Sequence, residues 1–109
     1  MAYEEALANR IRELLTGETP TEKRMFGGLA FLIVGHMAVA ASGRGGLMVR
    51  VPPDDTGKLL DRAHVEPVVM GGRETRGWLR VSDEGIRTRR QLESWVKRGV
   101  DHAKSLPPK

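Results

Sequence analysis

Arginine side chains in the last third of the sequence are spaced in a way that suits an anionic partner. Residues 1–72 hold 8 basic and 9 acidic side chains, a net charge of −1, whereas residues 73–109 hold 10 basic and 5 acidic ones, a net charge of +5. Guanidinium groups bind carboxylates and phosphates through paired hydrogen bonds. The sequence therefore predicts an interaction surface for an acidic protein or for nucleic acid. Its candidate residues are Arg24, Arg73, Arg76, Trp78, Arg80, Arg89 and Arg90.

Two of these arginines lie where helix stability does not favour them. Arg89 and Arg90 fall in the first turn of a predicted final helix, and the positive end of a helix dipole disfavours a cation there by roughly 0.3–1 kcal/mol. Binding of an anionic partner is one explanation for arginines at these two positions. The ordinary alternative is a solvated helix face of mixed charge, because Glu93 precedes Lys97 by one helical turn.

Trp78 is the aromatic member of the candidate surface. It alternates with Leu79, so one of the two side chains faces away from the core. If Trp78 is the outward one, a tryptophan beside arginines suits a protein contact, and a homodimer becomes plausible.

The sequence offers little for catalysis or for metal binding. Cysteine is absent, and none of the three histidines has a second ligand at helical metal spacing. The adjacent acids Asp54 and Asp55 are explained by the start of a helix. We therefore expect no catalytic residue, no metal and no cofactor, and no enzyme. The histidines are His36, His64 and His102, and the serines without a nucleophile-elbow setting include Ser42, Ser82 and Ser94.

Paired glycines mark backbone features. Gly27 and Gly28 precede a core strand, where a phosphate or peptide could rest, although a bulge or sharp bend is the simpler interpretation. Gly71 and Gly72 are predicted in a loop. The glycines of residues 43–46 lack the Gly-Lys-Ser/Thr ending of a phosphate loop and predict a hairpin connection.

The elements that must position these residues begin with an apolar run, MFGGLAFLIVGHMAVAA, at residues 25–41. It has 17 residues where a membrane span needs about 20, and glycines interrupt it. It divides into strands at 29–34 and 37–41 around a turn at Gly35 and His36, and a third strand follows at 47–51. The run is sheet core, so no membrane contact is expected.

Helices bracket this sheet. Apolar residues at helical spacing predict a helix over 3–15, a shorter one runs from Asp54 to Arg62, and Thr88 with Gln91 predicts a capping box for the last helix. Strands at 68–70 and 78–81 are joined by a loop that contains Gly77. The order is α-β-β-β-α-β-β-α. We predict one α+β domain over residues 1–109, with an antiparallel sheet packed by helices. The absence of cysteine and of an amino-terminal signal pattern predicts the cytoplasm.

The sequence resembles the amino-terminal domain of the TfoX (Sxy) competence regulators. The resemblance rests on the residues 23–28, KRMFGG, on the apolar hairpin, on MGGR at 70–73, on Gly77 with Trp78, and on Trp95 with Val96 in the closing helix. It implies an α+β fold of the kind shared with type III secretion chaperones and a role in regulating natural transformation genes. Full-length regulators of the family also carry a helical carboxy-terminal domain, so we expect a stand-alone first domain here.

The resemblance supplies no catalytic residues. The first function hypothesis is therefore a non-enzymatic regulatory or adaptor domain that acts through a protein partner. The alternative is a nucleic-acid-binding accessory domain that uses the basic carboxy-terminal face. A small enzyme or ligand carrier is the third hypothesis.

Overall fold

The computed structural model describes residues 5–25, 27–43, 45–70 and 72–107. Its elements follow the chain in the order α1 (Glu5–Leu14), β1 (Thr21–Met25), β2 (Gly28–Ile33), β3 (His36–Ala41), β4 (Leu47–Arg50), the 3-10 turn η1 (Pro53–Asp55), α2 (Thr56–Leu60), β5 (Val65–Met70), β6 (Arg73–Val81), the 3-10 turn η2 (Asp83–Ile86) and α3 (Arg89–Ser105).

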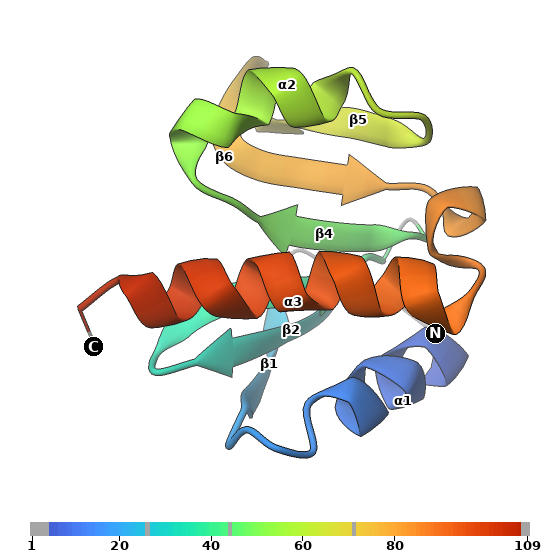
Figure 1. Ribbon diagram of the computed structural model, residues 1–109, viewed down its shortest axis with the longest axis vertical. Helices are drawn as coiled ribbons and strands as arrows, with labels where there is room; N and C mark the ends of the chain where they lie inside the picture. The colour runs from blue at the N-terminus through green and yellow to red at the C-terminus, as the bar shows by residue number, and fades with distance from the viewer. Residues whose placement is uncertain (1–4, 26, 44, 71, 108–109) are drawn as a thin grey trace.

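One antiparallel sheet organises the molecule, with the strand order β1-β2-β3-β4-β6-β5. The helices cover a single face: α3 crosses in front of the central strands, α1 lies below it, and α2 lies at the β5–β6 end (Figure 1). This is the α+β arrangement that the sequence predicts. No helix within the described ranges is long and apolar enough to cross a bilayer.

The main core lies between the helices and this face. Thr88 and Gln91 form the predicted capping box, which starts α3, and six residues of α3 are buried. From α1, Leu7, Ala8 and Ile11 are buried on one stripe. Phe31 of β2 is fully buried opposite these helices. The residues that α3 buries are Leu92, Trp95, Val96, Gly99, Val100 and Ala103.

A second, smaller core lies on the other face of the sheet. Ala30, Met37, Ala40, Met48 and Val68 form one cluster, and each has 8% exposure or less. Trp78 and Leu32 pack against it, half-buried. This face therefore carries a small apolar cluster of its own, on the side of the sheet that the helices leave uncovered (Figure 1).

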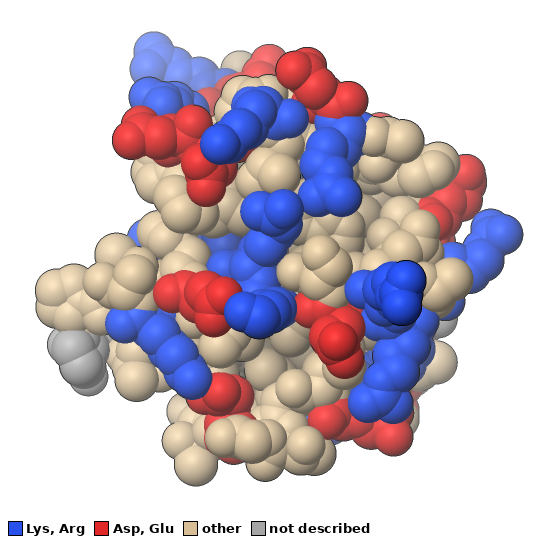
Figure 2. All heavy atoms as spheres, viewed as in Figure 1, with Lys and Arg blue, Asp and Glu red and all other residues tan. Residues whose placement is uncertain are grey.

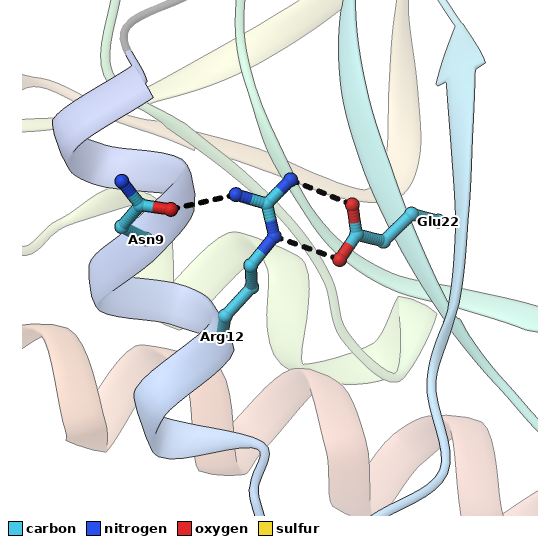
Figure 3. Close-up of polar contacts among 3 residues, drawn as sticks. All are labelled: Asn9, Arg12 and Glu22. Carbon is cyan, nitrogen blue, oxygen red and sulfur yellow. Dashed lines mark hydrogen bonds and ion pairs between the residues drawn. The ribbon is translucent and has the colours of Figure 1, made fainter.

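Strand β1 is an addition to the predicted order. Three of its five residues, TEKRM, are charged, and the side chains from Thr21 to Arg24 are all exposed at the sheet edge. It pairs with β2, and Arg12 of α1 holds Glu22 through two hydrogen bonds of 2.8 and 2.7 Å while Asn9 accepts a third at 2.7 Å (Figure 3). Tertiary contacts, and not strand propensity, thus place β1.

The turn between β2 and β3 differs from the prediction by one residue. Val34 and Gly35 form it, with φ of 48° and 87°, and His36 pairs with Ile33 as the first residue of β3. A two-residue hairpin turn of this type requires positive φ at both positions. His36, predicted in the turn, is therefore buried in a strand.

The predicted loop over 71–77 is also wrong from residue 73 onward, because β6 already begins at Arg73. Gly77 lies inside β6 with φ 88°, its N–H donates to Thr56 Oγ1 at 2.8 Å, and its carbonyl accepts from Val51 at 2.9 Å. Val51 directly follows β4 and Thr56 begins α2, so the partners of Gly77 are distant in sequence and local sequence does not reveal the strand. Gly72 precedes β6, and Gly71 lies outside the described residues.

The bend expected at Gly27 and Gly28 is the connection of β1 to β2. Gly27 has φ 74°, and Gly28 opens β2, where an added Cβ would stand 2.1 Å from the carbonyl oxygen of Ala41. The strand irregularity of this region lies further on, between Phe31 and Leu32. Gly28 is thus required for close packing of β2 on the end of β3.

Two helical glycines should respond in opposite ways to alanine. A Cβ on Gly99 of α3 would stand 2.4 Å from the Ala38 carbonyl oxygen, whereas a Cβ on Gly57 of α2 would meet nothing within 4 Å. We expect Gly99→Ala to lower the free energy of unfolding by about 1–3 kcal/mol through overpacking. Gly57→Ala should raise it by about 0.5–1 kcal/mol. Urea denaturation of both variants is the measurement, and equal effects would contradict the close approach of α3 to β3.

The contact between α1 and β1 should depend on pH. The hydrogen bond from Arg12 holds the pKa of the Glu22 carboxyl below its usual 4.5. Because the folded pKa is depressed, its contribution to stability is present above about pH 4.5 and is lost as pH falls through the folded pKa. Both side chains are more than a third exposed, so solvent limits the effect to about 1 kcal/mol. Glu22→Gln should be less stable than wild type at neutral pH and equal to it in acid. Glu13→Gln is the control, because Glu13 forms no ion pair with any residue that the structure describes.

Candidate functional site

A groove between α2 and the carboxy-terminal half of α3 brings several polar side chains together. Its volume is about 270 Å³. One wall is formed by the segment that follows β4, by η1 and by α2, and the other is formed by α3. The lining residues are Val51, Pro52, Asp55, Leu59, Arg98, Asp101, His102 and Ser105.

The helical period explains why α3 contributes four of these side chains. Arg98, Asp101, His102 and Ser105 follow one another at steps of three, one and three residues, so they share one side of the helix. The opposite wall forms because Pro52 and Pro53 end the strand that precedes η1. Leu59 then buries its side chain in the main core and fixes α2.

The two carboxylates of the groove already have cationic neighbours. Asp101 pairs with Lys97 at 3.1 Å, and Asp55 lies 3.5 Å from Lys58. The sequence suggested that Asp55 caps a helix, but its side chain makes no capping hydrogen bond. The negative charge in the groove is therefore partly balanced from its rim.

Arg98 has a different environment. Its Cζ stands 5.7 Å from the ring centroid of Trp95, and Arg62, which follows α2, stands 5.1 Å from the same ring. Trp95 is 5% exposed. Neither arginine forms an ion pair with any described residue. The aromatic ring thus orients two guanidinium groups whose hydrogen-bond donors remain available.

The environment of His102 disfavours the charged form of its imidazole. Burial lowers the pKa of its imidazole below the usual 6.5, and the positive charge of Arg50 and the proximity of His36 lower it further, while Asp55 acts in the opposite direction. Ser105 Oγ donates to the carbonyl oxygen of His102 at 2.6 Å. The hydroxyl proton is therefore directed at backbone and not at the imidazole.

His36 lies close to the end of α3. It is 9% exposed, and its Nε2 lies 2.6 Å from the carbonyl oxygen of Pro107. That contact requires the proton on Nε2 and leaves Nδ1 as an acceptor, which finds no partner among the described residues. The histidine thus anchors the segment that follows α3 to the start of β3.

The structure does not bring the arginines of the predicted interaction surface into one patch. Arg73 and Arg76 lie at the start of β6. Arg89 and Arg90 lie exposed in the first turn of α3, which follows the other end of that strand. Nine residues of strand span roughly 26 Å or more. Arg24 is exposed on the edge strand β1. The basic residues therefore belong to separate regions of the surface.

Three members of that surface are already engaged. Arg76 donates to the Pro53 carbonyl oxygen at 3.2 Å and lies 3.5 Å from Asp54. Arg80 donates to the Gly45 carbonyl oxygen at 3.0 Å. Trp78 lies on the second face of the sheet, half-buried beneath Arg50 at 5.6 Å. Trp78 is thus the outward member of its pair, as Leu79 is fully buried in the main core.

The groove itself was not predicted from the sequence. Its two walls are almost half the chain apart, and each lining residue had an ordinary local explanation. One local signal existed: Arg98 follows Trp95 by three residues on a helix, which is the spacing of neighbouring side chains.

Comparison with known proteins yields one family match. The family model described as TfoX N-terminal domain matches residues 13–103 of the 109-residue chain. No curated protein matches the chain at a significant level.

His102 provides a test of the electrostatics of the groove. We expect its imidazole to titrate below pH 6.5 in an NMR titration, because burial and Arg50 disfavour the charged form. Arg50→Gln should move the midpoint upward. With a depressed folded pKa, protonation below about pH 6.5 favours the unfolded chain, so His102 should reduce stability as pH falls through that range. A midpoint at or above 6.5 would contradict the buried environment.

Proposed function

The chain belongs to the TfoX N-terminal domain family, and on that premise we propose that it is a non-enzymatic regulatory or adaptor domain that acts through protein contacts. The resemblance to the Sxy regulators implies a role in controlling bacterial competence genes. We place that role in the cytoplasm, in keeping with a sequence without cysteine.

The observation that carries the proposal is the contrast between lysines and arginines on α3. Both lysines of the helix are paired, Lys97 with Asp101 and Lys104 with Glu18 at 2.8 Å. The exposed arginines at its start have no ion-pair partner among the described residues. These arginines are Arg87, Arg89 and Arg90. Arginine is enriched in protein interfaces, where its planar group binds carboxylates in pairs of hydrogen bonds.

The backbone around these arginines is held firmly. Arg10 of α1 donates to the carbonyl oxygens of Ile86 at 2.8 Å, Arg87 at 3.2 Å and Thr88 at 3.4 Å. The capping box then fixes the first turn of α3. A rigid backbone lowers the entropy lost on binding, which supports a contact surface at this position.

Mixed charge favours a protein partner over nucleic acid. Acidic side chains are interspersed among basic ones over the α3 face, as Figure 2 shows. Nucleic-acid binding needs several neighbouring phosphate contacts, and interspersed carboxylates weaken each of them. Nucleic acid nevertheless stays the second candidate because of the cluster at residues 87–90.

The test compares Arg89→Glu/Arg90→Glu with wild type in affinity capture from native lysate and in a thermal melt. We expect the variant to lose the protein that wild type captures while its melting temperature stays unchanged or rises slightly, because two cations leave the positive end of the helix dipole. Arg73→Glu/Arg76→Glu changes the net charge by the same amount at the start of β6, and this variant should still capture the partner.

Each other outcome has a defined meaning. A clear fall in melting temperature would make the arginines structural, and equal loss in both variants would assign capture to net charge alone. Binding of a random-sequence DNA duplex, with an affinity that falls steeply as salt rises, would favour the nucleic-acid candidate.

A further inference from the structure

The size of the groove between α2 and α3 limits what it holds. Small-molecule sites usually enclose roughly 300–1,000 Å³. At about 270 Å³, the groove suits one or two side chains of an extended segment better than a cofactor. Its apolar part is formed by Val51, Pro52 and Leu59, which suits an aliphatic side chain.

The groove is lined by one arginine, Arg98, and by two carboxylates, each of which has a lysine beside it. Lys97 and Lys58 stand beside the two carboxylates, and His102 is uncharged at neutral pH because its pKa is lowered. Arg98 and Arg62 have no ion-pair partner in the described part of the chain. Arg98 lines the groove, and Arg62, which does not, stacks on the same Trp95 ring beside it.

The Trp95 ring prepares these two groups for binding. A cation over an indole is stabilised by roughly 0.5–1 kcal/mol at an exposed site. Arg62 and Arg98 both share the ring, so part of their rotamer freedom is lost before any partner arrives. Less entropy remains to be lost on binding.

We propose that this groove docks a segment of the partner protein that carries an aliphatic side chain next to a carboxylate. The aliphatic group packs on Val51, Pro52 and Leu59, and the carboxylate binds Arg98 and Arg62. The inference rests on the proposed function, since it names the chemistry of the protein contact.

Two capped peptides test this chemistry, Ac-Gly-Leu-Glu-Leu-Asp-Gly-NH2 and its lysine counterpart Ac-Gly-Leu-Lys-Leu-Lys-Gly-NH2. In a Trp78→Phe background the remaining tryptophan, Trp95, reports binding by fluorescence. We expect the acidic peptide to bind about tenfold or more tightly than the basic one, as hydrogen bonds to charged groups are worth about 1.5–3 kcal/mol. Arg62→Glu/Arg98→Glu should reverse that preference, which a merely structural role would not do.

Arg89→Glu/Arg90→Glu is the matched control and should bind the acidic peptide within about twofold of wild type, because both arginines lie outside the groove. Amide shift mapping on the wild-type chain gives a readout that needs no variant, and the shifts should fall in residues 51–59 and 95–105. Four results would each overturn the inference. The two peptides bind equally, or the acidic peptide does not bind at about 1 mM. Alternatively, Arg62→Glu/Arg98→Glu still prefers the acidic peptide, or the amide shifts are centred on residues 87–92. If the groove fails these tests but wild type still captures a protein from lysate, the proposed function stands and only the groove inference fails. If the peptide binds but no protein is captured, the proposed function fails.

Discussion

The contact between Gly99 of α3 and the carbonyl oxygen of Ala38 in β3 determines where the longest helix lies on the sheet. A side chain at position 99 would need space that this oxygen occupies, since an added Cβ would stand only 2.4 Å away. The helix therefore approaches the sheet more closely than another residue would permit, and Val96, Val100 and Ala103 are buried around this point. With α3 over the centre of the sheet, α1 lies on one side of it and α2 on the other (Figure 1).

The position of α3 also decides which of its side chains face α2. Because Gly99 faces the sheet, Arg98 and His102 lie on a flank of the helix, and Trp95 lies one turn earlier beneath Arg98. The facing wall is fixed separately: Thr56 Oγ1 accepts from Gly77 of β6, and Leu59 is buried in the main core. The groove thus depends on two anchors, one for each wall, and neither anchor contributes a charge to it.

Local signals in the sequence account for much of this fold and for little of the groove. The capping box at Thr88, the apolar strands and the helix that ends before Gly17 follow from short-range patterns, and the structure confirms them. Strand β1 lacks such a pattern, because its charged residues become a strand only through pairing with β2 and the clasp of Arg12 on Glu22. The start of β6 likewise depends on Gly77 meeting Thr56. The groove brings residues 51–59 next to residues 98–105, and no local sequence pattern predicts that these two segments lie side by side.

Both tryptophans of the chain form cation–π contacts with arginines. Arg50 stacks on Trp78, and Arg62 and Arg98 stack on Trp95. The large apolar side chains that the described surface exposes are Val34, in the β2–β3 turn, and Val69, on the edge strand β5. They lie on opposite sides of the six-stranded order, so they do not form one continuous patch. The protein contact that we propose relies on oriented guanidinium groups around a small apolar floor. Charge complementarity contributes more to the specificity and the rate of association than to affinity, which is consistent with the regulatory role that we propose.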